Sequence, residues 1–101
     1  MNSVEEQLPP LRETVGFNIR LIRKHFEMTL EQLSLQFGHS IGSLSMIETG
    51  EVATTVDTID KIALALGCSA QLLVMVDGHV HAIAQIERRY GGRRRKISAK
   101  R

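Results

Sequence analysis

Two short helix patterns, separated by about three residues, are the feature that most limits how this chain can fold. Thr29 has the marks of a helix N-cap, and Gln32 three residues later completes a Thr-x-x-Gln capping box. Gly38 supplies the left-handed conformation that ends the helix, Ser40 is the next N-cap, and Gly50 stops the second helix. The apolar side of the pair consists of Leu33, Phe37, Leu44 and Ile47. Such a short connection is typical of a helix-turn-helix unit.

A further helix is predicted on each side of this unit. After Pro9 and Pro10, apolar residues recur at the helical period, at Leu11, Val15, Ile19, Ile22 and Phe26. Thr54 or Thr55 caps a helix that ends at Gly67, with an apolar stripe of Val56, Ile59, Ile62, Ala63 and Leu66. We therefore expect an all-α fold, a compact domain of four to five helices over residues 11–70, after a flexible N-terminal segment at residues 1–10.

Residues 71–90 form an extension whose structure the pattern leaves open. The dense apolar run Leu72–Val76 favours a β-strand, and the following Asp77-Gly78 is the strongest local signal for a two-residue hairpin. The competing pattern is a helix from about Val80 to Tyr90. Either form leaves apolar surface that a small body does not bury alone. We therefore expect a homodimer, with contacts at Leu72, Leu73, Val74, Val76, Val80, Ile83 and Ile86.

Charge is distributed unevenly along the chain, although the formal net charge is only +2. The last fifteen residues hold eight lysines and arginines against one glutamate, whereas the rest of the chain has twice as many acidic as basic residues. Residues 91–101 are therefore expected to be a flexible basic tail that contacts a polyanion, with phosphate contacts at Arg93, Arg94, Arg95 and Lys96.

Several classes of protein do not fit this sequence. A single cysteine, Cys68, cannot form an internal disulfide, and the polar N-terminus is no secretory signal. No apolar run is long enough to span a bilayer, so we expect a cytoplasmic protein without a membrane partner. His79 and His81 with Cys68 fall short of the four ligands of a structural zinc site. Without a catalytic motif, we expect no enzyme activity, no metal and no cofactor.

The stretch from Val15 to Leu73 resembles the Xre/Cro-type, lambda-repressor-like helix-turn-helix family. The resemblance rests on five fragments that occur in order and at matching spacing: Val15-Gly16-x-x-Ile19-Arg20-x-Ile22-Arg23-Lys24, Met28-Thr29-x-Glu31-Gln32-Leu33, Gly38-x-Ser40, Leu44-Ser45-x-Ile47-Glu48-x-Gly50, and Thr58-Ile59-x-Lys61-Ile62-Ala63-x-Ala65-Leu66-Gly67. It implies that Arg23 and Glu48 form a structural ion pair between the first helix and the end of the recognition helix.

The resemblance also implies a DNA-binding surface, with double-stranded DNA as the partner. Its residues lie at the start of the second helix and on the recognition helix with its flanks: Thr29, Leu30, His39, Ser40, Ile41, Gly42, Ser43, Ser45, Met46 and Thr49. The chain departs from the family at Ile41, Gly42 and Met46, where polar side chains would read purines with paired hydrogen bonds, and at Leu30, where a polar residue often grips phosphate. Base reading therefore depends on hydroxyls, thymine methyl contacts and DNA shape.

The preferred function is a homodimeric, sequence-directed, DNA-binding transcriptional regulator. One alternative is an antitoxin that represses its own operon and binds a toxin protein, because a strand directly after the fourth helix resembles such proteins. Another is a protein-only interaction module that uses the apolar surface of Leu30, Ile41 and Met46.

Overall fold

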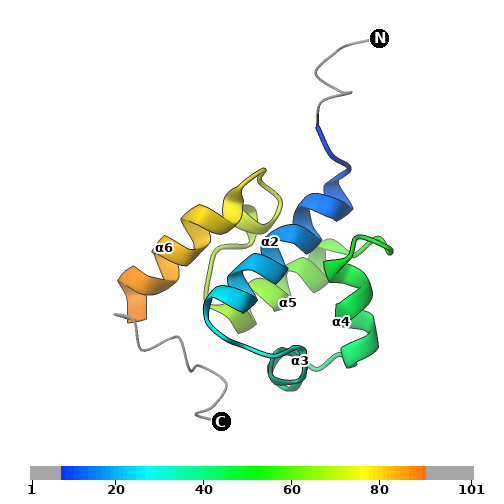
Figure 1. Ribbon diagram of the computed structural model, residues 1–101, viewed down its shortest axis with the longest axis horizontal. Coiled ribbons are helices and arrows are strands. Elements are labelled where there is room, and N and C mark those ends of the chain that lie inside the picture. The colour runs from blue at the N-terminus through cyan, green and yellow to red at the C-terminus, as the bar shows by residue number, and fades with distance from the viewer. Residues whose placement is uncertain (1–7, 91–101) are drawn as a thin grey trace.

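The computed structural model describes residues 8–90, which form five α-helices and one short 3₁₀ helix and contain no strand. The all-α fold is therefore confirmed. In chain order the elements are α2 (Leu11–His25), α3 (Leu30–Phe37), α4 (Ile41–Glu48), α5 (Val56–Leu66), η1 (Ala70–Leu73) and α6 (Gly78–Tyr90). Figure 1 shows α2 in the middle of the molecule, with α4 on one side of it and α6 on the other.

One continuous apolar core joins these elements. α2 contributes three almost completely buried side chains, Val15, Ile19 and Ile22. The other helices supply Leu33, Leu44, Ile62, Leu66, Leu73 and Ile86, all at most 2% exposed. Two residues of the predicted apolar stripes do not belong to this core. Leu11 and Val56 are exposed because each lies at the first position of its helix, beyond the neighbouring elements.

The predicted turn chemistry between α2, α3 and α4 is present. The Thr29 hydroxyl accepts a hydrogen bond from the Gln32 N–H, and the Gln32 side chain accepts one from the Thr29 N–H, which completes the capping box. Gly38 ends α3 with a φ of 89°, a conformation that glycine adopts without steric cost. Ser40 then caps α4 through the N–H of Ser43.

The chain after α5 differs from the preferred sequence interpretation. The strand predicted at Leu72–Val76 was wrong; of the two forms left open for the residues after it, the structure has the helix and not the hairpin. Asp77 takes a positive φ of 61°, but Gly78 already begins α6, so the paired left-handed turn of a hairpin does not form.

Asn18 supplies the physical reason for this difference. Its completely buried side-chain amide donates to the carbonyls of Leu73 and Met75, at 2.9 Å each, and its oxygen accepts from the N–H of His79 at 3.0 Å. These bonds satisfy backbone groups that a strand would have paired with a neighbour. A single polar residue on α2 therefore fixes the connection between η1 and α6.

The same packing changes the set of predicted dimer contacts. Leu73 and Ile86 are fully buried in the core of their own chain, so their prediction as contacts to a partner was wrong. Leu72 and Ile83 are half-buried against that core. The exposed members of the set are Val74, Val76 and Val80, around the start of α6.

Close contact between α2 and α4 depends on Gly16. A Cβ atom at this position would lie 2.3 Å from the carbonyl oxygen of Ile47 and 2.6 Å from that of Glu48, which is too close for any real side chain. α2 therefore reaches α4 only because residue 16 has no side chain.

We expect Gly16→Ala to lower the free energy of unfolding by about 1–3 kcal/mol, because the added methyl group forces α4 away from α2. Gly42→Ala is the matched control. A Cβ there meets nothing within 4 Å, so the better helix propensity of alanine should raise stability by about 0.5–1 kcal/mol. Urea denaturation measures both. Equal effects of the two substitutions would contradict the close contact.

Candidate nucleic-acid interface

The second helix of the helix-turn-helix, α4, presents one face to solvent along its whole length. Ile41 and Met46 are 44% and 42% exposed, and Gly42 and Ser43 are exposed beside them. The opposite face of α4 carries Leu44, Ile47 and Glu48, which are buried in the core. The sequence-predicted residues Ser40, Ile41, Gly42, Ser43 and Met46 are thus brought together on one outward surface.

The C-terminal end of α4 is fixed by the predicted ion pair. Arg23 Nε lies 2.7 Å from Glu48 Oε2 and Nη2 lies 2.9 Å from Oε1, so two nitrogens of one guanidinium donate to the two oxygens of one carboxylate. Arg23 Nη1 also donates to the carbonyl of Met28 at 2.8 Å, in the segment that leads into α3. Since both side chains are buried, this bidentate pair sets the position of α4 relative to α2 and α3.

The remaining predicted DNA contacts are either half-buried or have their hydroxyls engaged in hydrogen bonds within the chain. Leu30 packs partly against the core, and the Thr29 hydroxyl is engaged in the capping box. The half-buried ring of His39 stacks on Phe37, with 4.2 Å between the ring centroids. Ser45 is half-buried, and the exposed Thr49 donates its hydroxyl to the carbonyl of Met46. These residues frame the α4 surface rather than project from it. Arg93, Arg94, Arg95 and Lys96 lie outside the described residues.

A groove of about 260 Å³ beside α4 was not predicted from the sequence. It lies between α4 and the start of α5, and is lined by His39, Ser43, Met46, Ile47, Val52, Ala53, Thr54, Thr55 and Thr58. The sequence predicts Thr54 or Thr55 only as a helix cap, and Thr55 does cap α5 through the N–H of Thr58. The N-terminus of α5, with its threonine hydroxyls, therefore adjoins the exposed face of α4.

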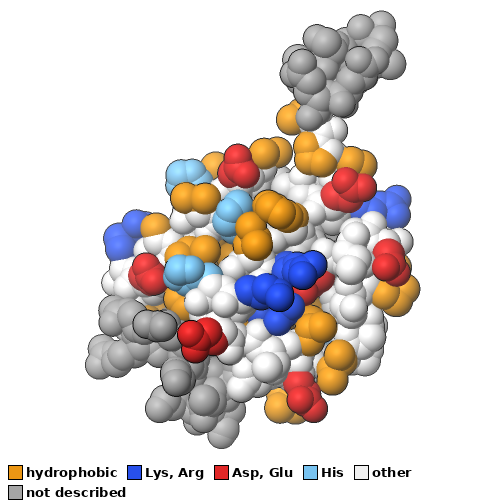
Figure 2. All heavy atoms as spheres, viewed as in Figure 1, with side chains coloured by type: hydrophobic (Ala, Val, Ile, Leu, Met, Phe, Trp, Pro, Cys, Tyr) orange, Lys and Arg blue, Asp and Glu red, His pale blue; other side chains and the backbone are white. Residues whose placement is uncertain are grey.

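The helix-turn-helix itself carries no positive side chain. No lysine or arginine occurs between Lys24 and Lys61, whereas Glu31 and Glu51 are exposed in this interval. Cations occur next to the motif instead: Figure 2 shows lysine and arginine side chains over the middle of one face, and Arg20 and Lys24 are exposed on α2. Any anion held by α3 and α4 must therefore be bound by helix N-termini, backbone N–H groups and hydroxyls.

The described residues do not assemble other chemistry. Burial raises the pKa of the Cys68 thiol to about 11, against the smaller opposite effect of Arg89, so the thiol is protonated at neutral pH and is a poor nucleophile. Within residues 8–90, no three His, Cys, Asp or Glu side chains form a group that could hold a metal ion. None of the helices in this range combines the length and apolar character needed to cross a bilayer.

Comparisons with known proteins agree with this geometry. A family model described as helix-turn-helix matches residues 19–73, from the middle of α2 to the end of η1. The chain belongs to the Xre/lambda-repressor-like helix-turn-helix family. This is a family of DNA-binding transcriptional regulators.

A solved structure supports the same assignment. The chain is similar to a hypothetical transcription factor, NHTF, from Neisseria, with 30% sequence identity and a TM-score of 0.64. The match covers 69% of this chain and 84% of the Neisseria chain. No curated protein sequence matches. In the present chain, α6 lies after residue 73, where the match to the helix-turn-helix family model ends.

We expect Arg23→Met to lower the free energy of unfolding by about 3–5 kcal/mol, because it leaves the buried Glu48 carboxylate without its partner. The double variant Arg23→Met with Glu48→Leu removes both charges and should be more stable than the single variant. Thermal and urea denaturation of the three proteins test this. A loss below about 1 kcal/mol in the single variant would show that the ion pair does not hold α4 in place.

Proposed function

We propose that this protein is a homodimeric, sequence-directed transcriptional regulator that inserts α4 into the major groove of DNA. The observation that carries the proposal is the outward surface of α4: its N-terminal turn is exposed, while its other face and its C-terminal end are held by the core and by Arg23. A recognition helix must present this end to base edges from a rigid support.

The side chains on this surface favour one mode of reading. Ile41 and Met46 are apolar and about half-exposed, so they suit contact with thymine methyl groups rather than paired hydrogen bonds to purines. Gly42 lies between them with open space where a side chain would be, which lets the helix backbone approach the DNA closely. Hydrogen bonding from the exposed surface falls to Ser43 and to the Ser40 hydroxyl that it contacts. We therefore expect recognition to favour A·T-rich sites and to depend on groove shape.

Binding strength is expected to come from a different part of the chain. Phosphates next to α4 meet the N-termini of α4 and α5, and the threonine hydroxyls of the groove between them. Because these donors are neutral, they do not displace the counterions condensed on DNA. We expect the basic residues that follow α6, including Arg93, Arg94, Arg95 and Lys96, to displace most of them.

The antitoxin alternative has lost the feature that suggested it. It depended on a strand directly after the fourth helix, and the described chain has the 3₁₀ helix η1 and then α6 in that place. The protein-only module remains the competing outcome of the binding experiment, because the apolar side chains of Ile41 and Met46 would also suit a protein surface.

A salt series separates these functions. The intact chain is titrated onto labelled random genomic fragments between about 50 and 300 mM salt, with fluorescence anisotropy as the readout. If about six phosphates are neutralised, log affinity should fall against log salt with a slope near −5. Replacing Arg93, Arg94, Arg95 and Lys96 by glutamine should make the slope shallower by roughly 3–4.

Lys61→Gln is the control for the loss of a single charge, because Lys61 lines a separate hollow between α5 and η1 and should leave the slope unchanged. No binding at the lowest salt would support the protein-only module. An unchanged slope in the fourfold variant would exclude the tail as the phosphate contact.

A further inference from the structure

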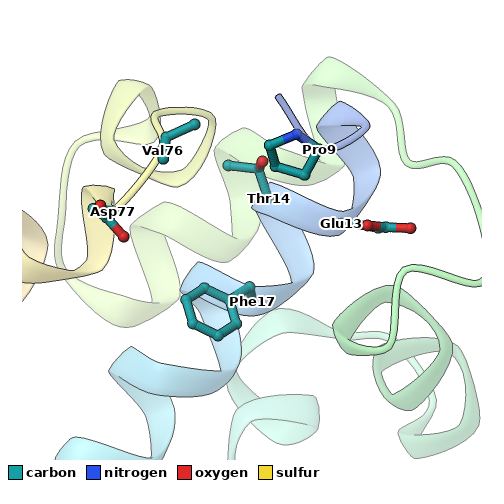
Figure 3. A pocket seen from close by; sticks show the side chains of 6 residues that line it. All are labelled: Pro9, Glu13, Thr14, Phe17, Val76 and Asp77. Atoms are coloured by element: carbon teal, nitrogen blue, oxygen red, sulfur yellow. The ribbon is translucent and has the colours of Figure 1, made fainter. Parts of the chain in front are cut away.

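The described surface carries a second notable feature, away from the groove beside α4. A hollow of about 330 Å³ lies where the N-terminal half of α2 meets the segment before α6. Its lining consists of Pro9, Glu13, Thr14, Phe17, Val76 and Asp77. Figure 3 shows Phe17, Thr14 and Pro9 along one side and Val76 across from them, while the Glu13 carboxylate points away. None of these residues lines the groove beside α4.

Apolar side chains gather around this hollow. Phe17 and Val76 line it and are 51% and 49% exposed. Met75 precedes Val76 in the chain, Leu8 precedes the lining residue Pro9, and Val80 lies four residues after Val76; these three are between 42% and 56% exposed. Figure 2 shows hydrophobic side chains gathered over this part of the molecule, near the start of α2 and of α6. We call these five residues the Phe17 surface.

The Phe17 surface is held rigidly by contacts behind it. The ring of Phe17 meets the ring of His79 edge to face, with 5.5 Å between the centroids. His79 is in turn fixed by Asn18, which accepts from its backbone N–H at 3.0 Å and lies 3.1 Å from its Nδ1 atom. A preorganised aromatic side chain loses little conformational entropy when a partner covers it, which is typical of the residues that dominate protein interfaces.

We infer that a second copy of this chain docks on the Phe17 surface; this deepens the homodimer of the proposed function and rests on it. The area favours this occupant. A stable interface buries about 800 Å² per partner, and the five apolar residues expose on the order of 500 Å² together. The five side chains can therefore supply the apolar centre of such an interface, with neighbouring residues making up the rest of its area.

The shape and charge of the surface point the same way. Projecting side chains and a hollow occur on one face, so a two-fold axis through it lets each copy place its side chains in the hollow of the other. The charged residues that line the hollow, Glu13 and Asp77, are both acidic, so nucleic acid is not the occupant. The face therefore serves assembly, while α4 remains free for DNA.

Val76 and Val80, two of the three exposed residues among the predicted dimer contacts, belong to this surface. Phe17 was not predicted, because on α2 it lies off the apolar stripe that faces the core. In the sequence, the available signal was an aromatic residue off the apolar stripe of the predicted helix, next to the polar Asn18.

The test measures the oligomeric state of the full chain by analytical ultracentrifugation, from about 1 to 200 µM. We expect a reversible dimer, and Phe17→Ser and Val80→Asp should each raise its dissociation constant by at least tenfold. Leu64→Asp is the matched control, since Leu64 is 81% exposed on α5 and does not line the hollow, and it should leave the dimer unchanged. Circular dichroism checks that each variant is folded.

Salt separates this inference from the proposed function. Dimer formation through an apolar, acid-rimmed surface should be unaffected or strengthened by salt, whereas DNA binding should weaken. A chain that is monomeric at every concentration, or a dimer that both substitutions leave intact, would overturn the inference. A salt-resistant dimer that binds no DNA would support it and overturn the proposed function instead.

Discussion

The position of α4 depends on two contacts with α2. Gly16 lets the backbones meet at the carbonyls of Ile47 and Glu48, and the buried pair of Arg23 and Glu48 then fixes the end of α4. Arg23 also holds the carbonyl of Met28, so one guanidinium connects α2, the approach to α3 and the end of α4. Because the core covers the opposite side of α4 through Leu44 and Ile47, the helix has only its outer surface left for a ligand.

Apolar surface and positive charge occur in separate parts of the chain. The α3–α4 unit exposes the apolar side chains of Ile41 and Met46 but has no lysine or arginine, which is unusual in a DNA-binding family. Lysines and arginines occur on either side of this unit in the sequence instead: Arg20 and Lys24 are exposed on α2, and most of the others lie in the last fifteen residues. α6, outside the matched family segment, packs beside α2 and helps to form the Phe17 surface.

Local signals predicted most of the fold because the helices begin and end at residues with strong conformational preferences. Thr29, Gly38 and Ser40 each act as expected, and so does the αL cap at Gly67. The same reasoning failed at Leu72–Val76, where the choice between strand and 3₁₀ helix was made by Asn18, more than fifty residues earlier in the chain. No local pattern contains that contact.

The candidate site was predictable to a similar extent and for similar reasons. The family resemblance identified the exposed residues of α4 and the ion pair behind them. It did not indicate that Leu30 packs against the core, nor that Thr54 and Thr58 line a groove beside Met46, because these facts depend on how α3 and α5 pack in three dimensions.

The central claim is that the outer face of α4 is the surface that meets DNA. The most direct measurement is an amide chemical-shift titration of the labelled full chain with a DNA duplex, recorded at moderate salt. We expect the largest changes at residues 40–46 and at the start of α5, with little change at Leu64 and Cys68, which line the hollow between α5 and η1. Shifts confined to residues beyond Tyr90, with α4 unperturbed, would contradict it.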